Sequence, residues 1–206
     1  MSPDLFNLYN EMIMREIKEL EGMILNGYNI NNIRYADGMV LVADSEEKLQ
    51  RLLNVLNEES VRKGLKINKS KTEIMVILRA DRNPRVNIRI EDNLVKQVDR
   101  FNYFGSLINK DGRCEDEIRK RINKAKYVFN KMKNLLINSK VSIETRKRFV
   151  KCYAWSTLLY GCESWTLRKP DIRRIQAAEM LFWRRLLKVS WIERITNEMI
   201  LERMNS

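Results

Sequence analysis

Apolar residues are spaced differently in the two parts of the chain, and this difference predicts the fold class. Up to about residue 112, short apolar runs between turn-forming residues predict strands, with helices at the start of the chain and at 45–63. Beyond residue 112, apolar residues recur every three or four positions, as they do on one face of a helix. The pattern predicts an α+β chain, with strands and helices in residues 1–112 and an all-α bundle in residues 113–206.

The clearest helical pattern lies at 115–137. Its apolar positions fall at steps of 4, 3, 4, 3 and 4, and they are Ile118, Ile122, Ala125, Phe129, Met132 and Leu136. Three acidic residues, 115–117, stand in the first turn, where the helix dipole stabilises negative charge. Further helices are predicted at 142–160, from residue 169 onward with Pro170 near the start, and at 196–204.

The first part of the chain centres on the segment NNIRYADGMVLVADSEEKL, residues 31–49. Asp37 and Gly38 separate two apolar runs, and an Asp-Gly pair in this position is a strong signal for a hairpin. Ser45 then caps a helix that Gly64 ends, while Ser2 and Pro3 are the expected cap and first residue of the opening helix. We expect residues 29–108 to form an antiparallel sheet on which helix 45–63 packs.

Charge is distributed unevenly along the chain. There are 39 Lys and Arg against 27 Asp and Glu, a net charge of +12. The first 50 residues hold 4 against 9, a net of −5, and the remaining 156 hold 35 against 18, a net of +17. This balance favours an anionic partner, most often nucleic acid, bound beyond residue 50.

Composition also excludes several classes of protein. The chain has no histidine, which excludes a histidine general base and the Ser-His or Cys-His nucleophile pairs. Its three cysteines form no Cys-x-x-Cys pair, which excludes a zinc ribbon and predicts reduced thiols. No apolar run reaches membrane-spanning length, and the acidic N-terminal segment is unlike a signal peptide. We therefore expect no membrane partner and an intracellular location, in the nucleus or cytoplasm rather than outside the cell.

Five segments carry a resemblance to a known family. RYADGMVLVADSEEKLQRLL resembles the Tyr-x-Asp-Asp hairpin of reverse transcriptases, with Gly38 in place of the second Asp. The other four are SPDLFNLYNEMI, GLKINKSKTEIMVI, FNYFGSLI and LLYGCESWTL. They follow the order seen in the reverse transcriptases of non-LTR, or LINE-type, retrotransposons, and FNYFGSLI is similar to the primer-grip segment.

The resemblance implies both a fold and a chemistry. Residues 1–112 would be the C-terminal part of a polymerase palm, and residues 113–206 a thumb-like or connector region. The family's RNA-directed DNA polymerases hold two magnesium ions with carboxylates. Asp37 matches one of these metal ligands, Lys71 a contact to the nucleotide phosphates, and Phe104 and Gly105 a contact to the primer backbone.

The departures from the family pattern predict a degenerate enzyme. Of the family's three metal-binding acids only Asp37 has a counterpart, and the segments for the fingers and an upstream Asp precede the point where this chain begins. We expect Asp37 to be a vestigial ligand that binds metal weakly or not at all, and we expect the chain to bind no Mg²⁺ and to be catalytically inactive.

Several alternatives stay open at this point. Asp37 also suits a tight turn, Lys71 a solvated strand end, and Gly105 a bend. Five aromatic residues could stack on bases, although their spacing favours the core; they are Trp155, Tyr160, Trp165, Phe182 and Trp183. The basic run 119–133 is either a solvated face or a nucleic-acid contact through Lys120, Arg121, Lys124 and Lys131, all expected to project into solvent.

Three functional hypotheses follow. The first is a truncated, degenerate reverse transcriptase. The alternative is a non-enzymatic basic α-helical module that binds nucleic acid or protein and reuses the retroelement fold. The third is a relic without function. For the first two, we expect RNA or an RNA–DNA duplex to be bound without sequence preference. The oligomeric state is left open.

Overall fold

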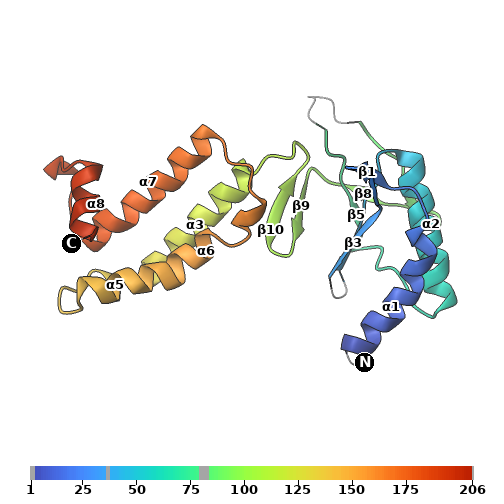
Figure 1. Ribbon diagram of the computed structural model, residues 1–206, viewed down its shortest axis with the longest axis horizontal. Helices are drawn as coiled ribbons and strands as arrows, with labels where there is room; N and C mark the ends of the chain where they lie inside the picture. The colour runs from blue at the N-terminus through green and yellow to red at the C-terminus, as the bar shows by residue number, and fades with distance from the viewer. Residues whose placement is uncertain (1–2, 36–37, 79–83, 206) are drawn as a thin grey trace. The chain divides into compact units, whose positions relative to one another are not determined.

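The chain forms two compact units in the computed structural model, which describes residues 3–35, 38–78 and 84–205 (Figure 1). The units are Met1–Asp99 and Arg100–Ser206. Strands and helices occur in both, so the predicted α+β class is confirmed. The contacts place the division before the last hairpin, whereas the predicted boundary at residue 112 follows the change from strands to helices and stays a prediction.

Two helices form the framework of the first unit. Helix α1 (Pro3–Lys18) begins at the predicted first helical residue, and the expected Ser2 cap lies outside the described residues. Helix α2 (Glu46–Arg62) is capped as predicted, because the Ser45 hydroxyl accepts a hydrogen bond from the backbone N–H of Lys48 at 3.3 Å. The two helices pack against each other through one apolar cluster. Its buried members are Ile13, Met14, Ile17, Leu52 and Leu56.

The strands of the first unit form separate two-stranded ladders. Three are antiparallel: β1 (Met23–Leu25) with β2 (Tyr28–Ile30), β3 (Asn32–Tyr35) with β4 (Gly38–Leu41), and β6 (Arg89–Ile90) with β7 (Asn93–Leu94). The fourth is parallel and joins β5 (Glu73–Ile74) to β8 (Lys96–Gln97).

The prediction of one antiparallel sheet over residues 29–108 is therefore wrong for the part of the chain that the structure describes. The strands are two to four residues long and each pairs along one edge only. Apolar side chains of β5, β6 and adjacent residues instead bury against α2, in a cluster of Leu53, Ile74, Ile88, Ile90 and Val95, whereas Ile24 and Leu25 of β1 and Ile33 of β3 stay exposed. Packing against a helix removes from water the same apolar side chains that the alternating pattern assigned to the buried face of a sheet.

The second unit is a hairpin followed by helices. Strands β9 (Arg100–Tyr103) and β10 (Ser106–Asn109) form the hairpin, which packs on α3 (Glu115–Lys131). The remaining elements are α4 (Lys133–Leu136), α5 (Ile143–Phe149), the π-helical η1 (Val150–Trp155), α6 (Ser156–Leu158), the 3₁₀ turns η2 (Cys162–Ser164) and η3 (Trp191–Glu193), α7 (Lys169–Leu186) and α8 (Asn197–Asn205). The helix predicted at 142–160 is thus present as α5, η1 and α6, with a π-helical middle. None of the described helices is long and apolar enough to span a bilayer.

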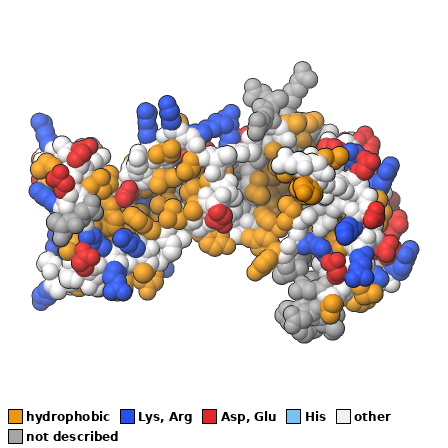
Figure 2. All heavy atoms as spheres, in the orientation of Figure 1, with side chains coloured by type: hydrophobic (Ala, Val, Ile, Leu, Met, Phe, Trp, Pro, Cys, Tyr) orange, Lys and Arg blue, Asp and Glu red, His pale blue; other side chains and the backbone are white. Residues whose placement is uncertain are grey.

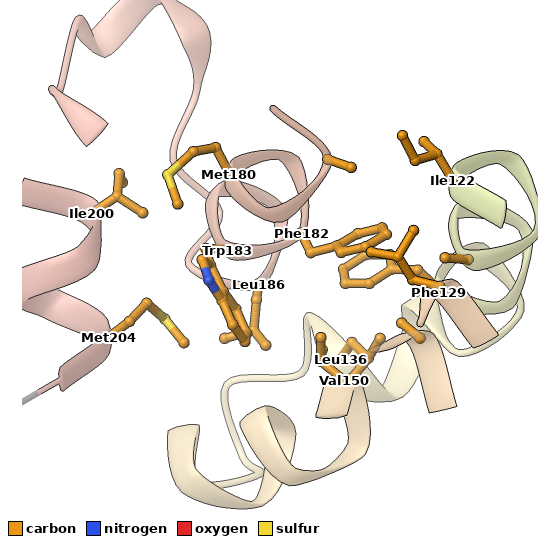
Figure 3. Close-up of a cluster of buried hydrophobic side chains, with 14 of the residues drawn as sticks. Ile122, Phe129, Leu136, Val150, Met180, Phe182, Trp183, Leu186, Ile200 and Met204 are labelled. Atoms are coloured by element: carbon orange, nitrogen blue, oxygen red, sulfur yellow. The ribbon is translucent and has the colours of Figure 1, made fainter. Parts of the chain in front are cut away.

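The core of the second unit confirms the predicted apolar stripe of α3 and α4 (Figure 3). Five of its six residues are buried, and the sixth, Met132, is partly buried against the same cluster. Phe129 stacks on Phe182 with ring centroids 5.1 Å apart. Phe182 and Trp183 are buried, as the core interpretation of the aromatic residues predicted, and Trp155 and Trp165 pack partly buried against the cluster. Tyr160 is exposed, so the core interpretation is wrong for this residue.

Candidate nucleic-acid interface on the β9–β10 hairpin and helix α3

The tip of the β9–β10 hairpin is a two-residue turn. Tyr103 pairs with Ser106, so Phe104 and Gly105 form the loop between the strands. Both have positive φ, 47° and 82°, which is the requirement of the type I′ turn whose twist suits a hairpin. Gly105 adopts this conformation without strain, whereas Phe104 is an uncommon residue there. The conformation of Phe104 must therefore be imposed by contacts outside the turn.

Three side chains from two distant segments supply those contacts. Arg121 Nη2 donates to the Gly105 carbonyl at 2.8 Å, and Lys120 Nζ donates to the same oxygen at 3.2 Å. The Tyr160 hydroxyl donates to the Phe104 carbonyl at 3.0 Å. Together these groups, which we name the tip clamp, hold both carbonyl oxygens of the turn.

Arg121 is anchored by a buried ion pair. Its Nε lies 2.5 Å from Oε1 of Glu117, one helical turn earlier, and the two residues are 5% and 2% exposed. The guanidinium also lies over the Tyr160 ring, 4.4 Å from its centroid, while the other Glu117 oxygen accepts from the Leu107 backbone N–H at 2.8 Å. The expectation that Arg121 projects into solvent is therefore wrong. A guanidinium is buried readily where a carboxylate, a carbonyl and a ring face satisfy its planar fork together.

Three lysines and a tyrosine of α3 lie in one row. Lys120, Lys124, Tyr127 and Lys131 follow at steps of 4, 3 and 4, on the face opposite the apolar stripe, and we name them the basic row. Lys124 and Lys131 are exposed as predicted, and the Lys131 ammonium lies 4.8 Å from the Tyr127 ring centroid. Lys120 is only partly exposed, because it also donates to Asn102 Oδ1 at 2.8 Å.

The acidic residues at the start of α3 are already paired within the second unit. Glu115 pairs with Arg119 and Arg174, and Asp116 pairs with Arg100. Glu117 forms an ion pair with Arg121, so every acidic residue of the first turn has a cationic partner. No acid follows between residue 119 and residue 133, and of the basic row the α3 carboxylates reach Lys120, whose Nζ lies 3.5 Å from Glu117 Oε2, but pair with neither Lys124 nor Lys131.

The predicted site residues of the first unit make fewer contacts that would support a role in binding. The Lys71 side chain is exposed, and its backbone N–H donates to the Asn68 side chain in a local turn at 3.2 Å. Asp37 lies outside the described residues, and Gly38 opens β4 opposite Tyr35. Among the residues that the structure does describe, no three acidic or cysteine side chains gather as metal ligands would.

The structure thus brings four of the predicted residues together: Phe104, Gly105, Lys120 and Arg121. Sequence reasoning missed their partners Glu117 and Tyr160. For Glu117 a signal existed, because Glu four residues before Arg on a helix is a favoured pair. For Tyr160 none existed, since 56 residues separate it from Phe104.

Comparison with known proteins places these features in a family. Residues 1–108 match the family model described as reverse transcriptase (RNA-dependent DNA polymerase). An uncharacterized transposon-derived protein of Caenorhabditis elegans is 29% identical over 174 residues, 82% of this chain. The Pol polyprotein of the type-1 retrotransposable element R2 of Nasonia vitripennis is 22% identical over 127 residues, 57% of this chain.

The matched segments span 60% of the length of the first relative and 12% of the second. The family model covers more than half of the chain, and both relatives derive from mobile elements. This chain belongs to the reverse transcriptase family, in the lineage of the non-LTR retrotransposons.

Proposed function

We propose that this chain is a non-catalytic nucleic-acid-binding protein that keeps the backbone-binding surface of its lineage and has lost polymerisation. In this proposal residues 1–112 correspond to the end of a polymerase palm and residues 113–206 to a thumb-like region. Tyr-Ala-Asp-Gly at residues 35–38 derives from the family's Tyr-x-Asp-Asp sequence.

The observation that carries the proposal is the basic row. Two of its lysines, Lys124 and Lys131, are exposed beside an exposed tyrosine, and the acids Glu115 and Asp116 pair with arginines outside the row. The second unit holds 24 Lys and Arg against 11 Asp and Glu, a net of +13, and Figure 2 shows Lys and Arg side chains standing out from its surface. A one-signed surface of this kind repels itself unless an anion is bound nearby.

The length of the row suits a phosphate backbone. Eleven residues separate Lys120 from Lys131, which at about 1.5 Å per residue is a run of roughly 16 Å. Lysines reach phosphates as flexible point charges, and such contacts position a duplex without reading its sequence. We therefore assign RNA or an RNA–DNA duplex as the partner, bound without sequence preference.

The residues of this chain do not fit two-metal catalysis. The family generally uses divalent metal ions, and two ions about 4 Å apart need more than one carboxylate to bridge and anchor them. Gly38 has no side chain at the position of the second Asp, and no acidic cluster compensates for it among the described residues. We propose no chemical step for this chain.

Binding is tested by fluorescence anisotropy with a labelled RNA–DNA duplex across a salt series. Lys124→Gln with Lys131→Gln should reduce the slope of log K against log salt by a little under ~2, since each phosphate contact contributes ~0.9. A control with Lys18→Gln and Lys66→Gln removes the same charge from exposed positions of the first unit and should leave the slope unchanged. Equal slopes for both doubles, or no binding by the wild-type chain, would refute the proposal.

Loss of catalysis is tested separately by primer extension on an RNA template with Mg²⁺ or Mn²⁺. The purified chain should give no template-dependent incorporation above a control without protein. Incorporation of nucleotides directed by the template would overturn the non-catalytic assignment, while leaving the result of the binding experiment intact.

A further inference from the structure

A cavity of about 400 Å³ lies within the second unit, where the end of α7 meets the ends of α3 and α4. This volume falls in the range of small-molecule sites. Ile137 and Val189 form an apolar part of its wall, and no acidic residue lines it in the part of the chain that the structure describes. Apolar walls beside charges of one sign focus the electric field on an anion. We name this cavity the cationic pocket after the four cations of its wall, Lys133, Arg184, Arg185 and Lys188.

Three of the four cations have no anionic partner. Lys133, Arg185 and Lys188 are exposed, and none of them forms an ion pair with a described residue. Arg185 is nevertheless held in place, because its Nη1 donates to Asn130 Oδ1 at 2.9 Å. These three positive charges surround one volume, and they repel one another unless an anion is bound between them.

The polar groups next to these three cations are engaged in contacts of their own. Arg184 donates to the Ile195 carbonyl at 2.6 Å and to Asn197 Oδ1 at 3.0 Å, and so holds the start of α8. Glu193 accepts a hydrogen bond from the Ser190 backbone N–H at 2.6 Å and closes its own turn. The groups that remain to bind a ligand are therefore cationic.

The helix dipoles account for only part of this positive charge. The C-terminal ends of α4 and α7 each carry roughly −0.5 of an elementary charge, about −1 together against three cations. Their carbonyl groups also have a cation already, since Arg146 Nη1 donates to the Leu186 carbonyl at 2.8 Å and to the Leu136 carbonyl at 3.3 Å. The cations of the pocket are thus not needed as helix caps, and their excess charge of about +2 suits an anionic ligand.

Lys188 occupies a position that ordinarily favours glycine. Helix α7 ends in a Schellman motif, in which the Val189 N–H donates to the Arg184 carbonyl at 2.9 Å and the Lys188 N–H to the Arg185 carbonyl at 3.2 Å. Residue 188 has a φ of 58°, a conformation that strains every residue except glycine. Glycine would end the helix without this strain, so the lysine indicates a role for its ammonium group at the pocket.

We propose that the cationic pocket binds a phosphate monoester, as carried by the phosphorylated end of a nucleic-acid strand. The inference rests on the proposed function and deepens it by naming a strand end in addition to the backbone. A monoester carries about −1.5 to −2 charges at pH 7, whereas a backbone diester carries about −1. The extended basic row suits successive diesters, and three cations around one volume suit the compact dianion.

The test is fluorescence anisotropy with an internally labelled single-stranded RNA. Three versions carry a phosphate at the 5′ end, a phosphate at the 3′ end, or hydroxyl groups at both ends. The wild-type chain should bind one phosphorylated RNA roughly 10-fold more tightly than the hydroxyl-ended RNA, as charge-assisted hydrogen bonds allow. Lys133→Gln with Lys188→Gln should remove this preference. Lys124→Gln with Lys131→Gln, which removes the same charge from the basic row, should weaken binding of all three RNAs and keep the preference.

Free AMP separates the two sources of a monoester. Saturation-transfer NMR should detect binding of AMP to the wild-type chain, and the Lys133→Gln, Lys188→Gln variant should lose it. If AMP binds as tightly as the phosphorylated RNA, the ligand is a free small molecule and the strand end is overturned. Because this signal needs no RNA, it reads the pocket even where the backbone interface of the proposed function fails.

Lys188→Gly distinguishes a ligand contact from a structural role. Glycine relieves the positive φ, so this variant should raise the urea midpoint while it lowers the preference for the phosphorylated RNA. Two outcomes would overturn the inference. One is equal affinity of the wild-type chain for the three RNAs, and the other is a preference that survives in Lys133→Gln with Lys188→Gln. A normal salt slope on the basic row combined with either outcome rejects the pocket alone.

Discussion

Replacing Arg121 with Met tests whether the tip clamp is a structural anchor. The change leaves Glu117 buried with two remaining partners, the Leu107 N–H at 2.8 Å and Lys120 at 3.5 Å. Breaking a buried pair by removing one partner typically costs about 3–5 kcal/mol, and the two remaining partners place the value near ~3 kcal/mol. Loss of the guanidinium from the Tyr160 ring adds roughly 0.5–1 kcal/mol. The sum is a large share of the ~5–15 kcal/mol that stabilises a domain.

The measurement is urea unfolding followed by tryptophan fluorescence. All four tryptophans lie in Arg100–Ser206, so the signal reports the second unit alone. Arg119→Gln is the control, because its pair with Glu115 lies on the surface and should contribute about 0.5 kcal/mol or less. If Arg121→Met destabilised the unit no more than Arg119→Gln, the buried pair would not anchor the hairpin and the reasoning would be refuted.

Three further changes probe other contacts. Gly161→Ala should lower the free energy of unfolding of the second unit in urea by about 1–2 kcal/mol, because residue 161 has a φ of 75°. The new Cβ would also clash with the Ser106 hydroxyl and lower the stability further. Adding Ser106→Ala should restore only the part of the stability that the clash removed. Ser45→Ala removes the cap of α2 and should cost about 1 kcal/mol, seen as faster hydrogen exchange of α2 amides and not of α1. Lys69 lowers the pKa of Glu91, first by a side-chain hydrogen bond and then by its charge, so Lys69→Ala should raise this pKa toward its ordinary value in an NMR titration. The stabilising contribution of a carboxylate with lowered pKa is present above its ordinary pKa and is lost as pH falls through the lowered one, so an unchanged titration of Glu91 in Lys69→Ala would contradict this assignment.

The helices were predictable because their evidence is local. The steps of the α3 stripe and the Ser45 cap depend on residues within a few positions of one another, and both are confirmed. The β3 and β4 strands around residues 36–37 follow from the same kind of local signal. The spacing of apolar residues and the capping residues therefore locate a helix or a hairpin wherever one short segment contains all of the evidence for it.

Contacts between segments were harder to predict. An alternating pattern shows that one face is buried but not what covers it, which is why short ladders over α2 were taken for one sheet. Arg121 was expected to face solvent because it lies outside the apolar stripe of its helix, yet its burial depends on Glu117, Tyr160 and the Gly105 carbonyl together.

The tip clamp has a consequence for how this hairpin tolerates mutation over evolutionary time. Lys120, Arg121 and Tyr160 bind carbonyl oxygens, which every amino acid presents equally. The turn can therefore keep its shape when the side chain of residue 104 changes, provided that the new residue tolerates the positive φ of 47°. The shape of the hairpin tip depends instead on Lys120, Arg121 and Tyr160. We therefore expect selection to conserve these three residues, which lie outside the turn, more strongly than the side chain of residue 104.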